Sequence, residues 1–91
     1  MFKPRILTKL NKINDPIKDL IQNAPIVELY GTARVFVENH LGIIIYTQEE
    51  IQIKMQYGIL IVKGSELILL QIGKEQLVIK GNIESLQLIG R

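Results

Sequence analysis

The strongest structural pattern in this chain reads Gly58-Ile59-Leu60-Ile61-Val62-Lys63-Gly64-Ser65-Glu66-Leu67-Ile68-Leu69-Leu70. Two aliphatic runs, rich in β-branched side chains, flank a short polar break at residues 63–66. This pattern predicts a β-hairpin whose strands are joined at the polar break. Its first half nearly recurs 17 residues later as Leu77-Val78-Ile79-Lys80-Gly81. The sequence therefore predicts one hairpin unit that is used more than once in the C-terminal half.

Length and composition restrict the classes of protein that fit. The 91 residues predict one small domain, and with 47% hydrophobic but only 5% aromatic residues its core must be aliphatic. The absence of cysteine excludes disulfides and thiolate metal sites. A net charge of +2, with no basic cluster beside the few aromatic residues, does not indicate nucleic-acid binding. We expect no nucleic-acid partner, no cofactor and no small-molecule substrate.

Residues 1–24 are predicted to form a basic amphipathic helical arm. Apolar residues recur there at the helical spacings of three and four, namely Ile6, Leu7, Leu10, Ile13, Ile17, Leu20 and Ile21. Asp15-Pro16 is typical of an N-cap followed by proline in the first helical position, so we expect a short second helix over about residues 16–23. The basic residues of the chain are concentrated here, since residues 1–22 carry a net charge of +3.

Two roles fit such an arm. It can cover one end or one face of a sheet, or it can rest on a membrane surface or a membrane partner. The side chains expected to make the second kind of contact are Lys3, Arg5, Lys9 and Lys12.

Residues 25–91 are predicted to form an all-β domain. Proline at position 25 ends the arm, and short apolar runs then recur every eight to nine residues, separated mostly by breaks that contain glycine. The expected strands are 26–30, 34–38, 42–47, 51–55, 59–63, 67–72, 76–80 and 83–89. This spacing favours an antiparallel meander that forms a small roll, sandwich or partial barrel. The 17-residue near-repeat leaves a β-solenoid-like stack as the alternative.

The faces of these strands differ in polarity. Apolar and polar residues alternate over 51–55, which predicts one buried and one wet face. The runs 43–45, 59–62 and 67–70 are apolar on both faces, so we expect them in the middle of the structure with cover on both sides. The arm, the sheet curling on itself, or an interface between copies of the chain can supply that cover.

No arrangement of residues in the sequence indicates catalysis. His40 is the single histidine and lies in a predicted turn. It has no obvious set of catalytic partners, because the chain has no cysteine and its two aspartates lie in the arm. The carboxylates of Glu49 and Glu50 are adjacent in sequence and point opposite ways on an extended chain. The glycines are scattered singly and form no phosphate-binding loop. We expect a protein that is not an enzyme.

Residues 25–89 resemble the YabP/YqfC family of sporulation proteins. The likeness is carried by the segments 25–31, 37–47, 51–53, 58–64 and 77–83. Its most distinctive piece is a signature turn, made of Glu38, Asn39, His40 and Gly42, followed by an apolar strand. The family supplies no catalytic residues, and the signature turn is expected to act in structure or in contact.

The resemblance implies a cytoplasmic protein of the mother cell in an endospore-forming bacterium. Its members are linked to the outer layers of the forespore, so a structural or assembly protein of spore coat or cortex morphogenesis is expected. The apolar strands predict that it self-associates into a homo-oligomer. The alternative is an adaptor at the forespore membrane, docked through the arm on a sporulation membrane protein such as the YqfD companion of the YqfC branch.

Overall fold

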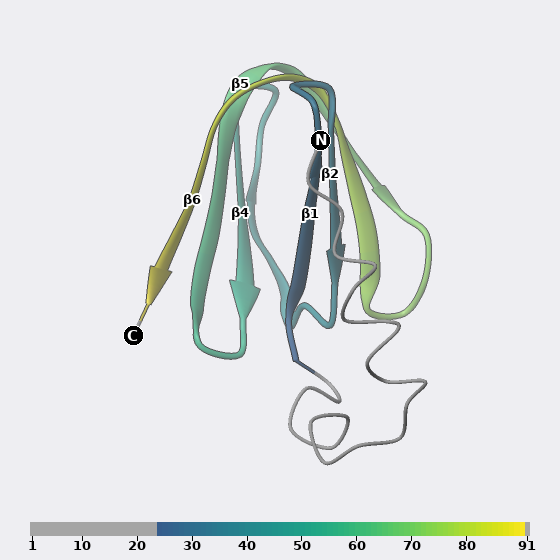
Figure 1. The fold of residues 1–91 in the computed structure, drawn as a ribbon, viewed down its shortest axis with the longest axis vertical. Coiled ribbons are helices and arrows are strands. Elements are labelled where there is room, and N and C mark those ends of the chain that lie inside the picture. Colours follow the sequence, from purple (N-terminus) through teal and green to yellow (C-terminus); the bar gives the residue numbers. More distant parts are fainter. Residues whose placement is uncertain (1–23, 91) are drawn as a thin grey trace.

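A computed structural model describes residues 24–90, which form six antiparallel strands in one sheet (Figure 1). The strands are β1 (Ile26–Tyr30), β2 (Arg34–Glu38), β3 (Gly42–Tyr46), β4 (Glu50–Met55), β5 (Gly58–Gln71) and β6 (Gln76–Gly90). Their order across the sheet is β1-β2-β6-β5-β4-β3. Since every strand pair is antiparallel, the predicted all-β antiparallel class is confirmed.

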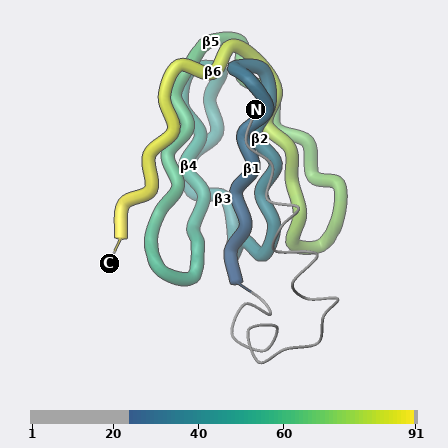
Figure 2. Tube along the Cα trace, in the orientation of Figure 1, coloured from purple at the N-terminus to yellow at the C-terminus, as the bar shows by residue number. Residues whose placement is uncertain are grey.

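The sheet folds over on itself because β5 and β6 are long and bend together. Residues 58–63 of β5 pair with β4 and with residues 85–90 of β6. Beyond the bend, residues 68–71 of β5 pair with residues 77–80 of β6, which in turn pair with β2. The bend therefore makes two layers, one that ends in β1 and one that ends in β3. Figure 2 traces both long strands over the same end of the molecule.

The bend lies at the two Lys-Gly pairs of the near-repeat. A Cβ atom on Gly64 would lie 1.9 Å from the carbonyl oxygen of Asn82, so no side chain fits there. Gly81 has a φ of +140°, and a Cβ atom on it would lie 2.7 Å from the carbonyl oxygen of Glu66. The two glycines let β5 and β6 cross closely at the bend, where the strand register also shifts.

Two tight turns hold the bend from either side. The turn between β1 and β2 accepts a hydrogen bond at Thr32 O from Ile83 N, at 2.8 Å. The turn between β3 and β4 accepts one at Gln48 O from Leu67 N, at 2.9 Å. Because backbone groups at a bend lose partners in the sheet, these bonds satisfy donors that would otherwise be left without one.

Several details of the predicted topology are wrong. Residues 63–66 and 81–82 are bends within strands, so the predicted hairpin break at 63–66 does not exist and eight predicted strands become six. The solenoid-like alternative is wrong because the pairing is antiparallel throughout. A meander connects β3 to β6 in order, but β2 pairs with β6 rather than with β3.

The core lies between the two layers and is aliphatic apart from one methionine. Its members are Val35, Val37, Ile51, Ile53, Met55, Leu60, Val62, Leu67, Leu77, Ile79 and Ile83. The alternation predicted for β4 is confirmed, because Ile51, Ile53 and Met55 are buried. The prediction that residues 43–45 lie in the middle is wrong, because β3 is the last strand of the sheet. The cover predicted on both faces of residues 67–70 is also wrong, because Ile68 and Leu70 are exposed. The predicted helical arm lies outside the described residues, apart from its last residue, Ala24.

Candidate interaction surfaces

The signature turn joins β2 to β3 and so carries the chain from one layer to the other. Asn39 has a φ of +65°, a left-handed conformation that asparagine tolerates better than most residues. Its backbone N–H donates to Glu75 O at 2.8 Å, and its side-chain amide donates to Ala24 O at 2.7 Å. This one residue therefore ties the turn to the start of β6 and to the entry of β1.

His40 is 7% exposed and closes the turn from inside. Its Nδ1 accepts a hydrogen bond from the backbone N–H of Gly42 at 3.0 Å. Because a backbone N–H only donates, Nδ1 carries no proton and the proton lies on Nε2. Nε2 is buried and has no hydrogen-bond partner among the described residues. Gly42 itself has a φ of +142°, which few other residues adopt.

The structure brings the four signature residues together without assembling a reactive group. The carboxylate of Glu38 accepts a hydrogen bond from the side chain of Gln76 at 3.3 Å, which adds a side-chain contact to the pairing of β2 with β6. Within residues 24–90, no cluster of three or more histidine and acidic side chains has the geometry to hold a metal ion. The geometry that is present orders the backbone. The predicted contact residues Lys3, Arg5, Lys9 and Lys12 lie outside the described part of the chain.

The most unusual surface is the edge of the sheet at β3. Its sequence, Gly-Ile-Ile-Ile-Tyr, holds no charge and no proline, and its four large side chains are all exposed. Ile43 and Tyr46 pair with the buried residues Ile53 and Ile51, so they point toward the interior of the sandwich. They nevertheless remain 41% and 50% exposed. The inner side of this edge therefore lacks cover within the described residues.

The second layer also has exposed aliphatic side chains next to β3. There, Ile68 and Leu70 of β5 are both exposed. The Tyr46 hydroxyl accepts a hydrogen bond from the backbone N–H of Leu69 at 3.0 Å, which brings the two edges together. We call this surface the apolar edge, and it consists of Ile43, Ile44, Ile45, Tyr46, Ile68 and Leu70. The sequence predicted the apolar runs 43–45 and 67–70 that supply five of these residues, but it favoured covered positions in the middle of the structure, since an uncharged run is also typical of a central strand.

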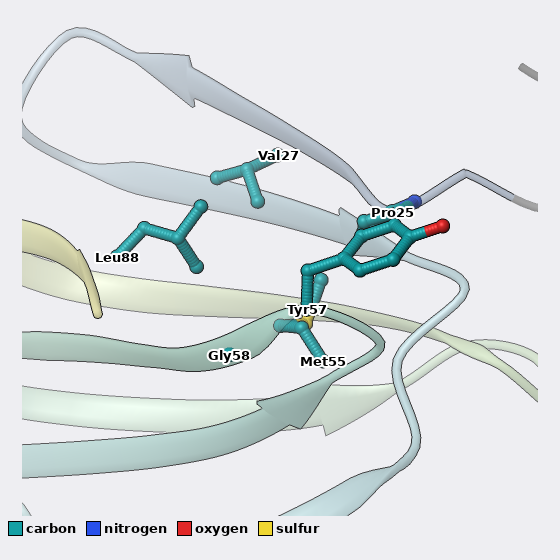
Figure 3. A pocket seen from close by; sticks show the side chains of 6 residues that line it. All are labelled: Pro25, Val27, Met55, Tyr57, Gly58 and Leu88. Carbon is teal, nitrogen blue, oxygen red and sulfur yellow. The ribbon is translucent and has the colours of Figure 1, made fainter. Parts of the chain in front are cut away.

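A small pocket opens between β1 and the end of β6 (Figure 3). We call it the seam pocket; it is lined by Pro25, Val27, Met55, Tyr57, Gly58 and Leu88. Its volume is about 100 Å³. The hydroxyl of Tyr57 points away from the pocket, so the side chains around it present apolar atoms (Figure 3). Nothing in the sequence predicted this pocket, because its walls come from four strands, from the turn between β4 and β5, and from Pro25.

Comparisons with known proteins place these features in a family. The model of the YabP family matches residues 22–91 of this chain. The chain is also similar to the protein named "Uncharacterized protein YqfC" of Bacillus subtilis (strain 168), at 22% identity over 82 residues, which cover 90% of this chain and 88% of that protein. No solved structure matches. Within residues 24–90, no helix is long and apolar enough to cross a membrane.

Proposed function

This chain belongs to the YabP family, and we propose that it is a non-enzymatic structural protein of endospore formation whose copies associate. In this proposal it takes part in spore coat or cortex morphogenesis in the mother cell. The link to sporulation is what the resemblance to the YabP/YqfC proteins implies. The mode of action is inferred from the surface of the molecule, with the apolar edge as the observation that carries it.

The apolar edge is a surface that a monomer in water would be expected to protect. Edge strands are normally guarded by charges, prolines or a covering segment, because their free backbone groups can pair with another chain. β3 has neither charge nor proline over its five residues. When a strand pairs with its own copy across a two-fold axis, like residues face like at the centre, so an uncharged strand meets no repulsion there. We therefore assign β3 as the strand through which two copies associate.

A single charge at the centre of β3 tests this assignment in solution. Ile44→Lys places a cation on the apolar edge, and Ile89→Lys places the same charge on β6 at a residue of similar exposure, 44% against 48%. Sedimentation velocity over a concentration series should show association for the wild-type chain and for Ile89→Lys, and a monomer for Ile44→Lys. A wild-type chain that is monomeric at every concentration, or an Ile44→Lys variant that associates equally well, would refute the proposal.

The cellular part of the proposal needs the host organism. Disruption of the gene should reduce the number of heat-resistant spores and leave a defective coat or cortex in thin-section images. Complementation with the wild-type gene should restore both, whereas the Ile44→Lys gene, expressed at the same level, should not. Normal spores after disruption would contradict a required role in the spore layers.

The arm supports a second candidate function, that of an adaptor on a sporulation membrane protein. The observation in its favour is the net charge of +3 on residues 1–22 in a chain with a total of +2. Replacing Lys3, Arg5, Lys9 and Lys12 by glutamine removes these charges and keeps the apolar stripe. The variant should leave the membrane fraction of sporulating cells if the arm is the anchor. An unchanged distribution would exclude this function.

A further inference from the structure

The seam pocket lies where two sheet edges face each other without pairing. Within the described residues, β1 pairs with β2 alone, and residues 85–90 of β6 pair with β5 alone. Each of these strands therefore has one edge without a neighbouring strand within residues 24–90. The seam pocket opens at the end of this gap, next to the first residues of β1 (Figure 3).

The seam pocket has the size and polarity of a site for aliphatic side chains. Met55 forms its floor and is 1% exposed, whereas Leu88 on its rim is 61% exposed. A volume of about 100 Å³ is somewhat smaller than the apolar cavity of about 150 Å³ that accepts benzene in a protein interior. An apolar hollow with an exposed leucine on its rim gains stability when another apolar group covers it.

The chain enters the described structure at the rim of this pocket. Pro25 is one of the pocket walls, and the carbonyl of Ala24 is fixed by the side-chain amide of Asn39 at 2.7 Å. The described part of the chain therefore begins at a fixed point beside the pocket. Leu20 is five residues from Pro25, which limits their separation to roughly 17 Å even in an extended chain. Side chains tethered this closely are present at an effective concentration in the millimolar range.

We propose that residues 16–23 of the same chain cover the seam between β1 and β6, with Ile17, Leu20 and Ile21 directed into and around the seam pocket. Their spacing places these three side chains on one face of the helix that the sequence predicts, and Lys18 and Asp19 away from it. The covering segment adds apolar area to a small core and shields the strand edges that have no neighbouring strand within residues 24–90. This inference does not depend on association at the apolar edge, which lies at the other end of the strand order.

Engineered disulfides test the proposal in the full-length chain, which contains no cysteine. The test pair is Leu20→Cys with Leu88→Cys, and the matched control is Asp19→Cys with Leu88→Cys. Both pairs have nearly the same tether, so tethering alone predicts equal rates of oxidation. We expect an intramolecular disulfide that forms at least tenfold faster in the test pair, followed by non-reducing electrophoresis and intact mass. Equal rates, no disulfide, or a disulfide mainly between two chains would overturn the proposal, and the last result would assign the pocket to a second copy.

A second measurement does not need new cysteines. The chain has two methionines, Met1 and Met55, so selective ¹³C-methyl labelling gives a spectrum with two methionine signals, one of them from the pocket floor. In the full-length chain, Leu20→Ser should shift the Met55 signal, and Lys18→Ser should leave it in place. A Met55 signal that ignores both changes would overturn the proposal, even if the cysteine variants fail to fold.

Discussion

Substitution of Gly81 by alanine should test the bend that folds the sheet. Gly81 has a φ of +140°, a backbone conformation that costs other residues about 1–3 kcal/mol. An added Cβ atom would also lie 2.7 Å from the carbonyl oxygen of Glu66 and 3.0 Å from the Cα atom of Leu67, both in the backbone of β5. Because a backbone cannot rotate away as a side chain can, the two strands must move apart, which adds on the order of 1 kcal/mol. We expect Gly81→Ala to lower the free energy of unfolding by about 2–4 kcal/mol.

The assay is urea unfolding followed by far-ultraviolet circular dichroism, with a thermal scan beside it. A loss of this size should lower the melting temperature by roughly 10–25 °C for a domain of this length. Gly73→Ala is the matched control, because the atom nearest to its new Cβ is the end of the flexible Gln76 side chain. The control should change the free energy of unfolding by no more than about 0.5 kcal/mol. If Gly81→Ala unfolds at the same urea concentration as the wild-type chain, the bend does not depend on this glycine and our account of the fold is wrong.

Three further predictions concern the core, the apolar edge and the signature turn. Leu60→Ala should lower the free energy of unfolding in urea by about 2–5 kcal/mol, because the side chain is buried between the layers. Ile61→Ala, on the outer face of the same strand, should cost less. Similar losses at both positions would contradict the assigned faces. Tyr46→Phe removes the acceptor for Leu69 N–H and should lower the free energy of unfolding by about 0.5–1.5 kcal/mol. Hydrogen exchange at the Leu69 amide should become faster. Unchanged exchange would show that the hydrogen bond is absent in solution. Asn39→Gly and Asn39→Ala both lose the side-chain hydrogen bond, but glycine adopts the left-handed conformation more readily than alanine. Asn39→Gly should therefore have the higher melting temperature of the two. The reverse order would refute the conformational argument.

The buried face of β4 and the turn between β2 and β3 could be predicted from the sequence. The alternation in residues 51–55 identified both the buried face of β4 and its approximate length, because side chains on a strand point to opposite faces in turn. Asn39 identified the turn between β2 and β3, because an asparagine side chain can hydrogen-bond to nearby backbone and so favours turns. These features depend on neighbouring residues alone, and a sequence contains that information directly.

The bend in β5 and β6 could not be distinguished from a pair of hairpin turns. Lys63-Gly64 and Lys80-Gly81 have the composition of turns, and the prediction of a chain reversal at each was wrong. Whether the backbone reverses or only bends depends on its pairing partner, and here each glycine lies against the opposite strand at its own bend. That contact joins residues that are distant in sequence, so it is decided when the two strands pair.

The sequence by itself determined an all-β, aliphatic, antiparallel domain and the buried face of β4. The tertiary structure alone decided which apolar strands are covered. Ile59 to Val62 and Ile43 to Ile45 look alike as sequences, yet the first run lies in the middle of the sheet and the second at its edge. The physical reason is that the strand order depends on contacts between distant residues. These are the pairing of β2 with β6 and the packing of the two layers around one core. The apolar edge and the seam pocket are products of that packing.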